Sequence, residues 1–233
     1  MTEFRPGSFQ ILPVIIKNLI IINVLVFAAQ NVISPTSGFS MENTFALHTW
    51  QSQLFKPWQF VTYLFLHGDI MHIFFNMLAL WMFGSTLENL WGPKRFLIFY
   101  LACGLGAALC HMTVLYVENQ NLINDFSTWS PQDQMDNLAA LRAHLNSPTL
   151  GASGAVFGCL AAFGYMFPND YMYVYFFPVK VKWFVLIYAG TELLSALKNT
   201  AGDNVAHVAH LGGALVGFIM VYFWKKNNRR NLY

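Results

Sequence analysis

The feature that most restricts this chain is a series of apolar segments, most of them long enough to cross a lipid bilayer. A membrane-spanning helix needs about 20 mostly apolar residues. Only 10% of the residues are charged, compared with about 25% in an ordinary soluble domain. We therefore expect an all-α integral membrane protein with six transmembrane helices, at residues 18–33, 69–87, 96–116, 151–167, 178–197 and 205–224. The alternation of apolar and polar residues that a membrane β-barrel requires is absent from the sequence.

The distribution of lysine and arginine predicts the orientation of these helices, because cytoplasmic loops are enriched in both residues. Of the 13 lysines and arginines, only Lys56, Arg142 and Lys198 fall on the side of the predicted topology opposite to the two termini. Both termini should therefore be cytoplasmic. We expect one membrane domain over 1–233, with a cytoplasmic N-terminus at 1–17, outer loops at 34–57 and 118–148, and a cytoplasmic tail at 225–233.

The N-terminal residues lack the features of a cleavable signal peptide, so the first apolar segment is expected to remain as an anchor. The small size and the absence of a transit peptide favour a multi-pass protein of the bacterial inner (plasma) membrane. The net charge of +2 is too small to suggest a nucleic-acid partner. The lipid bilayer is the expected partner, and the sequence leaves the oligomeric state open.

The outer loop at 118–148 is expected to contain a short helix. Ser130 and Pro131 are typical of an N-cap and a first helical position, and Asp133 falls in the first turn. Apolar residues follow at helical spacing, which predicts an amphipathic helix that lies at the outer membrane surface or packs on the outer loops. These residues are Met135, Leu138, Leu141 and Leu145.

Several polar side chains stand inside the apolar segments, where each is costly and needs a reason. The segment at 69–87 contains His72 and Asn76, which share one helix face. Ser153 opens the segment at 151–167, and the segment at 205–224 contains His207 and His210. Any one of these side chains alone could serve only to form a hydrogen bond between helices, which contributes about 1 kcal/mol or less. Their combination favours chemistry, because three segments supply complementary groups.

Peptide hydrolysis by serine needs these types of group. A serine hydroxyl needs an adjacent base, usually histidine, and the tetrahedral intermediate needs hydrogen-bond donors for its oxyanion. Ser153 would be the nucleophile and His210 the base, with His72, Asn76 and the backbone N–H of Ser153 as oxyanion donors. Glycines at four-residue spacing would bring the two helices close enough for this contact. These supporting glycines are Gly154 and Gly158 in one segment and Gly213 and Gly217 in the other.

These motifs resemble those of the rhomboid family of intramembrane serine proteases. Gly151-Ala152-Ser153-Gly154 is similar to the GxSG of the family, His210 with Gly213 and Gly217 to its HxxGxxxG, and His72 with Asn76 to its HxxxN. The resemblance covers nearly the whole chain. It implies a rhomboid-like bundle and a serine endopeptidase that hydrolyses peptide bonds in or near transmembrane helices of membrane-protein substrates, without a cofactor or metal.

The resemblance also implies a Ser–His dyad with no third, acidic member. We expect no carboxylate near His210, because Asp203 lies in the preceding link, and we expect Glu192 to hydrogen-bond a neighbouring helix. Phe157, one turn after Ser153, should pack on the catalytic imidazole. One departure concerns the first outer loop, where Trp58-Gln59 replaces a common Trp-Arg pair. The hydrogen bonds of that guanidinium must be lost or replaced.

The sequence also suggests how a substrate could reach the predicted site. The helix at 178–197 could act as a lateral gate, and the link from Lys198 to Asn204 could form a cap with Gly202 as hinge.

A catalytically silent rhomboid-like protein that binds membrane clients remains an alternative. A metal-dependent protein is a weaker one, because no HExxH motif is present. A transporter is disfavoured, because no inverted repeat is seen. The metal-dependent alternative would use His67, His72, His207 and His210.

Overall fold

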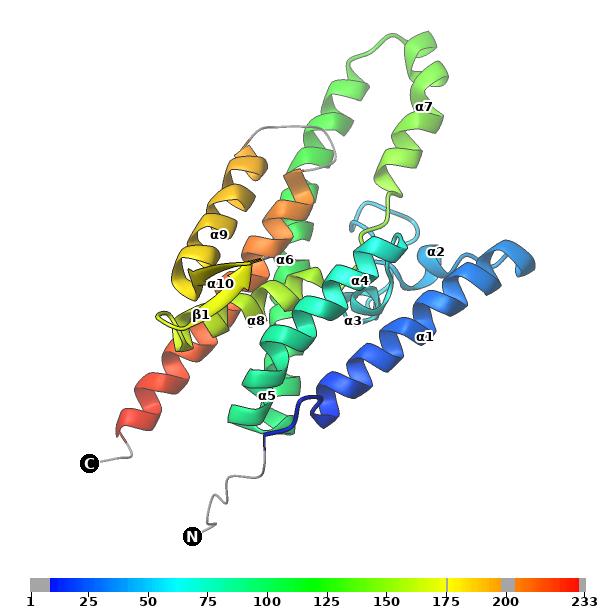
Figure 1. Ribbon diagram of the computed structural model, residues 1–233. Coiled ribbons are helices and arrows are strands. Elements are labelled where there is room, and N and C mark those ends of the chain that lie inside the picture. The colour runs from blue at the N-terminus through cyan, green and yellow to red at the C-terminus, as the bar shows by residue number, and fades with distance from the viewer. Residues whose placement is uncertain (1–8, 175, 198–203, 231–233) are drawn as a thin grey trace.

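The computed structural model describes residues 9–174, 176–197 and 204–230, apart from the side chains of 34–37, 204–206 and 227–230. Its elements form a bundle of helices with one small hairpin (Figure 1). The main helices are α1 (Val14–Ser37), α4 (Ile70–Ala79), α5 (Ser85–Trp91), α6 (Pro93–Ser127), α7 (Pro131–Leu145), α8 (Ser153–Met166), α9 (Val181–Leu197) and α10 (Asn204–Arg230). The short elements are α2 (Met41–Phe45), α3 (Gln59–Thr62), η1 (Tyr63–Phe65), η2 (Leu80–Gly84), β1 (Tyr171–Val174) and β2 (Phe177–Lys180).

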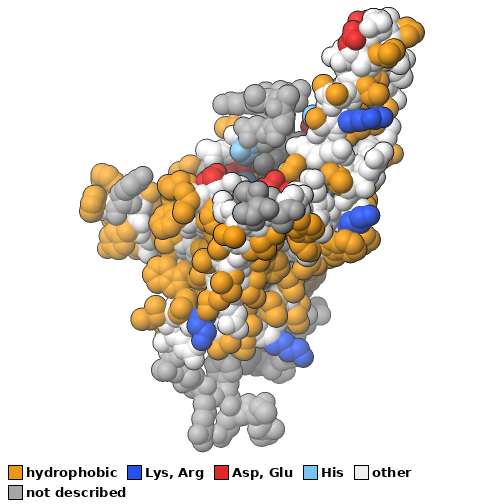
Figure 2. Space-filling view, turned by 90° about the vertical axis from the view of Figure 1, so that its right-hand side faces the viewer, with side chains coloured by type: hydrophobic (Ala, Val, Ile, Leu, Met, Phe, Trp, Pro, Cys, Tyr) orange, Lys and Arg blue, Asp and Glu red, His pale blue; other side chains and the backbone are white. Residues whose placement is uncertain are grey.

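Helices long and apolar enough to cross a bilayer are present, which confirms an integral membrane protein. Among the described residues four stretches qualify, namely Val14–Ile33, Ile70–Trp91, Pro93–Ser127 and His207–Lys226. The second runs unbroken from α4 through the π-helical turn η2 into α5. Figure 2 shows hydrophobic side chains over much of one face, with lysine and arginine at its margins. Because α8 and α9 have only 14 and 17 residues, the count of six spans remains a prediction.

Close contact between α8 and α10 forms the centre of the bundle. A Cβ added to Gly213 would lie 1.9 Å from the carbonyl oxygen of Gly154, and one added to Gly217 would lie 2.6 Å from that of Gly158. Both distances are far below van der Waals contact, so the two backbones touch through glycine. Helix α6 closes the same layer, because a Cβ on Gly154 would lie 2.4 Å from the Cβ of Ala107.

The start of α1 is held by the end of the second span. Glu88 is 3% exposed, and its two carboxylate oxygens accept hydrogen bonds from the backbone N–H groups of Ile15 and Ile16, each at 2.9 Å. The first N–H groups of a helix have no partner within the helix and carry partial positive charge. The Glu88 carboxylate satisfies two of them and joins α1 to α5.

The segment from Glu118 to Pro148 differs from the predicted loop. Helix α6 continues to Ser127, and α7 begins at Pro131 after the cap Ser130, whose Oγ accepts from the N–H of Asp133 at 3.2 Å. The two helices form a hairpin that extends beyond the rest of the bundle (Figure 1). Helix α7 has no buried residue among those described, and its C-cap residue Asn146 accepts a hydrogen bond from Ser52 Oγ at 2.7 Å. The polarity of this segment excluded a membrane span but not a helix.

A β-hairpin corrects the all-α expectation. Strands β1 and β2 pair antiparallel from Tyr171 opposite Lys180 to Val174 opposite Phe177. The predicted fifth helix at 178–197 therefore starts three residues later, at Val181. The aromatic and β-branched residues of this region suit a pleated strand.

Gln59 makes four hydrogen bonds in the loop between α2 and α3, at the position where the family commonly has an arginine. Its side chain is fully buried. Its Oε1 accepts from the N–H groups of His48 and Lys56 at 3.3 and 3.1 Å. Its Nε2 donates to the carbonyl oxygens of Thr44 and Leu54 at 3.3 and 2.9 Å. One amide therefore joins α2 and the residues that follow it to the segment before α3.

We expect Gln59→Leu to destabilise the protein, because it removes the side-chain partner of four backbone groups in this loop, one of them buried and three partly buried. Each unsatisfied group costs about 1 to 3 kcal/mol, so we expect a total of about 2 to 4 kcal/mol after relaxation. The thermal unfolding midpoint in detergent should fall by about 5 to 10 °C. Gln53→Leu in the same loop is the control, because Gln53 is exposed. Equal midpoints for the two variants would contradict this role of Gln59.

Candidate active site

Backbone hydrogen bonds between two loops and η1 place Ser153 at the start of α8. Leu47 and Thr149 form a two-way backbone bridge, with both N–H to oxygen distances at 2.8 Å. Gly151 donates its N–H to the carbonyl oxygen of Tyr63 at 2.9 Å. The φ angle of Gly151 is +128°, a conformation that residues with a side chain rarely adopt. This glycine turns the chain sharply, so that Ser153 becomes the first residue of the helix.

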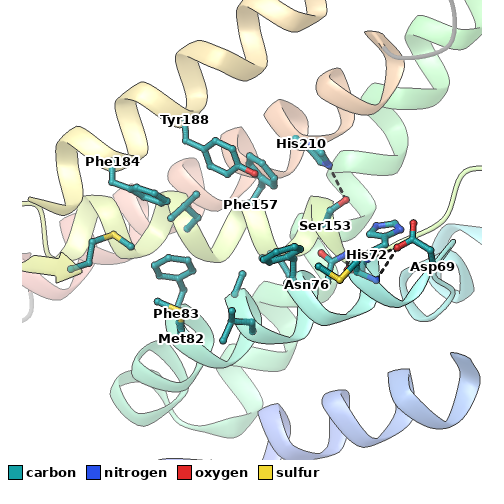
Figure 3. Close-up of a pocket in the computed structure, with 17 residues that line it drawn as sticks. Asp69, His72, Asn76, Met82, Phe83, Ser153, Phe157, Phe184, Tyr188 and His210 are labelled. Atoms are coloured by element: carbon teal, nitrogen blue, oxygen red, sulfur yellow. Dashed lines mark hydrogen bonds between the residues drawn. The ribbon is translucent and has the colours of Figure 1, made fainter. Parts of the chain in front are cut away.

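Ser153 and His210 meet across the α8–α10 contact. The Nε2 atom of His210 lies 2.9 Å from the Oγ atom of Ser153, a hydrogen-bond distance (Figure 3). The ring of Phe157 stacks on the His210 imidazole, with centroids 4.2 Å apart and planes 4° from parallel. Tyr188 of α9 stacks on the other side of Phe157, with centroids 5.0 Å apart. The imidazole is therefore held at a fixed tilt next to the serine.

A carboxylate lies beside His210, contrary to the sequence-based expectation. The Oε2 atom of Glu192 on α9 lies 2.9 Å from Nδ1 of His210. The same oxygen lies 2.6 Å from Nδ1 of His207, one helical turn earlier on α10. Glu192 is therefore bonded to a neighbouring helix, as expected, but one of its partners is the candidate base. His207 contacts Glu192 rather than Ser153, which leaves His210 as the histidine at the serine.

His72 and Asn76 face the same cavity from α4. Asp69 caps this helix by accepting from the N–H groups of Met71 and His72 at 2.8 and 2.9 Å. A Cβ added to Gly151 would lie 2.8 Å from Nε2 of His72, so this ring lies directly against the glycine before the serine. The Nδ1 atom of His72 accepts a long bond of 3.4 Å from the N–H of Gly68. In a neutral ring this bond to Nδ1 leaves the proton on Nε2, the atom that lies against Gly151.

The amide of Asn76 has a local partner in this state. Its Nδ2 donates to the carbonyl oxygen of His72 at 3.1 Å, one turn back in the helix. An amide carries two N–H groups, so this bond leaves one for another acceptor. Asn76 is 6% exposed and lines the cavity that contains Ser153.

An apolar cavity of about 570 Å³ runs from the serine into the bundle. Helices α4 and η2 form one wall, α8 forms the floor, and Phe184 and Tyr188 of α9 form the opposite wall (Figure 3). Polar groups gather at one end, where His72, Asn76, Ser153 and His210 line it. The remainder is lined mostly by apolar side chains. They include Met71, Phe75, Leu78, Ala79, Met82, Phe83, Val156, Phe157, Leu160 and Met172.

The four histidines considered as metal ligands separate into two pairs. His67 and His72 lie together with ring centroids 5.0 Å apart. Among the described residues, the one group of three side chains whose ligand atoms converge is Glu192, His207 and His210. The four histidines of the metal-dependent alternative therefore do not converge among the described residues. Hydrogen bonds to Glu192 account for the position of His207 and His210. The predicted cap at Lys198–Asn204 lies, up to residue 203, outside the described residues.

Comparison with known proteins gives one family. The family model described as Rhomboid domain matches residues 54–227. Rhomboid protein 1, mitochondrial, of Saccharomyces cerevisiae is 31% identical over 160 residues, which cover 69% of this chain and 39% of the relative. Rhomboid protease GluP of Bacillus subtilis is 29% identical over 162 residues, 69% of this chain and 25% of the relative.

A longer match is found to the human presenilin-associated rhomboid-like protein, mitochondrial. It is 28% identical over 214 residues, 89% of this chain and 48% of the relative. The chain thus spans less than half the length of each of these three relatives. Two of them are mitochondrial and one is bacterial, so the relatives do not single out the bacterial membrane that the sequence suggested.

Proposed function

This chain belongs to the rhomboid family, and from that premise we propose that it is an intramembrane serine endopeptidase. It hydrolyses a peptide bond in or near a transmembrane helix of another membrane protein. The observation that carries the proposal is the 2.9 Å contact between Ser153 Oγ and His210 Nε2 at the polar end of an apolar cavity. The relative named Rhomboid protease GluP supports the same activity.

The reaction follows from the positions of these groups. His210 Nε2 accepts the proton of the Ser153 hydroxyl as Oγ attacks the scissile carbonyl. The protonated imidazole then gives that proton to the leaving amine as the carbon–nitrogen bond breaks. Water then attacks the acyl carbon while it loses a proton to the same nitrogen, and the imidazole returns that proton to Oγ as the bond between Oγ and the acyl carbon breaks. Stacking on Phe157 keeps the imidazole in place through both steps.

The negative oxygen of the tetrahedral intermediate needs donors near Ser153. The backbone N–H of Ser153 lies in the first turn of α8, where N–H groups have no helical partner and the helix dipole favours negative charge. The Nε2–H of His72 and the second N–H of Asn76 complete the oxyanion site. All of these groups border the cavity end that contains Ser153.

The cavity wall formed by α9 suggests how a substrate enters. Trp183, Leu186 and Ile187 of α9 are more than half exposed and face outward, whereas Phe184 lines the cavity. Movement of α9 would open the cavity sideways to the bilayer, and a locally unwound substrate helix could then reach Ser153. In this proposal six helices cross the membrane with both termini cytoplasmic. The described ends of α1 and α10 that adjoin the termini lie on one side of the bundle (Figure 1).

Covalent labelling tests the proposal. A small organophosphorus reagent that phosphorylates activated serines should label the folded wild-type protein in detergent, and mass spectrometry should place the label on Ser153. Ser153→Ala should take up no label while keeping the wild-type unfolding midpoint. A folded wild-type protein without label would overturn the protease and favour the catalytically silent, client-binding alternative.

Asn76→Ala tests the oxyanion site. Loss of one oxyanion donor lowers turnover by about 10² to 10³ where this has been measured. We expect kcat on a transmembrane substrate to fall by about 100-fold with KM little changed, because the bond forms only in the transition state. Asn31→Ala is the control, since Asn31 on α1 makes the same type of bond to a carbonyl one turn back but is exposed. A kcat for Asn76→Ala within threefold of wild type would exclude it as a donor.

A further inference from the structure

Glu192 forms a continuous chain of hydrogen bonds with His210 and Ser153, the two reacting groups. Its Oε2 lies 2.9 Å from Nδ1 of His210, and Nε2 of the same ring lies 2.9 Å from Oγ of Ser153. The three groups come from α9, α10 and α8, so the chain of hydrogen bonds crosses three helices. Glu192 is 7% exposed, which makes an incidental surface contact an inadequate explanation.

We propose that Glu192 is a positioning residue that makes the Ser153–His210 pair a three-membered Ser–His–Glu system. The inference rests on the proposed function and departs from the dyad that the family resemblance implies. Glu192 touches neither the substrate nor the reacting atoms. It acts on the reaction only through His210.

The first part of this role is selection of a tautomer. A carboxylate can only accept hydrogen bonds, so each imidazole nitrogen that faces it must carry a proton. A neutral imidazole has one N–H, so a proton on Nδ1 leaves Nε2 of His210 unprotonated. An unprotonated Nε2 can accept the proton of Ser153. Where an amide replaces the carboxylate of a serine-protease triad, the wrong tautomer lowers turnover by about 10⁴.

The second part is compensation of charge. When His210 takes the proton of Ser153, the ring becomes a cation in surroundings with few other polar groups. A carboxylate at hydrogen-bond distance from Nδ1 stabilises this cation, and it does so only in the state that leads to products. Such an interaction raises kcat more than it changes KM.

His207 explains how the carboxylate stays in place. Its Nδ1 binds the same Oε2 at 2.6 Å from one turn earlier on α10. Two donors from one helix therefore converge on one oxygen, which fixes the direction of the Glu192 side chain. In this arrangement His207 also carries its proton on Nδ1, and it orients Glu192 rather than substrate.

A purely structural role predicts a different result. If Glu192 only joined α9 to α10, its loss would loosen the proposed gate. Access of a transmembrane substrate would then stay the same or improve. Labelling of Ser153 by a small reagent, which does not need the gate to open, would be unchanged. The two roles therefore predict different results for two measurable rates, the labelling rate of Ser153 and the turnover of a transmembrane substrate.

The test compares Glu192→Gln with wild type, with Thr191→Val as a matched control on the exposed face of the same helix. The rate of Ser153 labelling is measured in detergent, kcat and KM are measured in proteoliposomes, and thermal unfolding gives the folded fraction. We expect Glu192→Gln to lower both the labelling rate and kcat by about 100-fold or more, with KM nearly unchanged. Thr191→Val should match wild type. A folded Glu192→Gln that labels and turns over within threefold of wild type, or faster, overturns the proposal.

Glu192→Asp provides a second, independent test if the glutamine variant does not fold. Its carboxylate keeps the charge but is one methylene shorter, so contact with His210 weakens. We expect a folded Glu192→Asp to label about 10-fold more slowly than wild type. Labelling at the wild-type rate overturns the proposal. If wild type itself takes no label on Ser153, the proposed function fails instead, so the two failures are distinguishable.

Discussion

Ser153→Ala should reduce cleavage of a transmembrane substrate to background, a loss of about 10⁴-fold or more. The serine oxygen forms the covalent bond to the acyl group, and no other hydroxyl is found among the residues that line the cavity at His210 except that of Tyr188. The Tyr188 ring stacks on Phe157 rather than on the imidazole. Without Oγ, His210 can at best activate water, which lacks a fixed position.

The assay uses protein in liposomes with a fluorescent transmembrane peptide that contains small, helix-breaking residues near the outer end. Fragments are counted by electrophoresis and the cut is located by mass spectrometry. Ser147→Ala is the control, because Ser147 is an exposed serine in the segment before α8. A chelator is included, and it should leave wild-type cleavage unchanged. Cleavage by Ser153→Ala would exclude Ser153 as the nucleophile, and loss of cleavage with the chelator would favour a metal-dependent reaction.

Local patterns predicted the helices and brought the right residues under consideration. The apolar runs predicted spans at 69–87 and 96–116, which correspond to α4–α5 and to α6, although α5 ends at Trp91 and α6 at Ser127. His72 and Asn76, Ser153, and His210 were each identified by spacing within one helix. That the three sets share one cavity is a property of packing, which spacing alone does not determine.

The Glu192–His210 contact could not be predicted in this way. The two residues lie 18 positions apart on different helices, and nothing flanking Glu192 indicates a partner. The sequence did contain one indication: a carboxylate within an apolar helix is costly, so Glu192 must have a polar partner. The sequence offers several polar groups on other helices, and only the rotation of α9 against α10 selects among them.

The hydrogen bonds of Gln59 illustrate a different limit. The sequence showed that an arginine was missing after Trp58, but not that one glutamine would bind four backbone groups. That outcome depends on how the loop between α2 and α3 closes around the amide. The β1–β2 hairpin was missed for a related reason, since its short aromatic strands resemble the start of an apolar helix.

Gly213→Ala should remove both the stable fold and the activity, although it adds only one methyl group. The new Cβ would lie 1.9 Å from the carbonyl oxygen of Gly154. The Cβ is fixed directly to the backbone and its partner is a backbone oxygen, so neither atom can turn aside. Helices α8 and α10 would have to separate, and the same separation would pull Ser153 away from His210. We expect a loss of about 3 kcal/mol or more in the free energy of unfolding.

Gly190→Ala is the matched control for this prediction. Gly190 is on α9, and a Cβ added to it meets nothing within 4 Å. Alanine is favoured over glycine in a helix by about 1 kcal/mol, so this variant should be as stable as wild type or slightly more stable. Thermal unfolding in detergent and labelling of Ser153 are measured for both variants. An unfolding midpoint for Gly213→Ala equal to that of Gly190→Ala would mean that α8 and α10 do not meet through their glycines. In that case the distance between Ser153 and His210 would have to be maintained by other contacts, foremost the Glu192 carboxylate on α9.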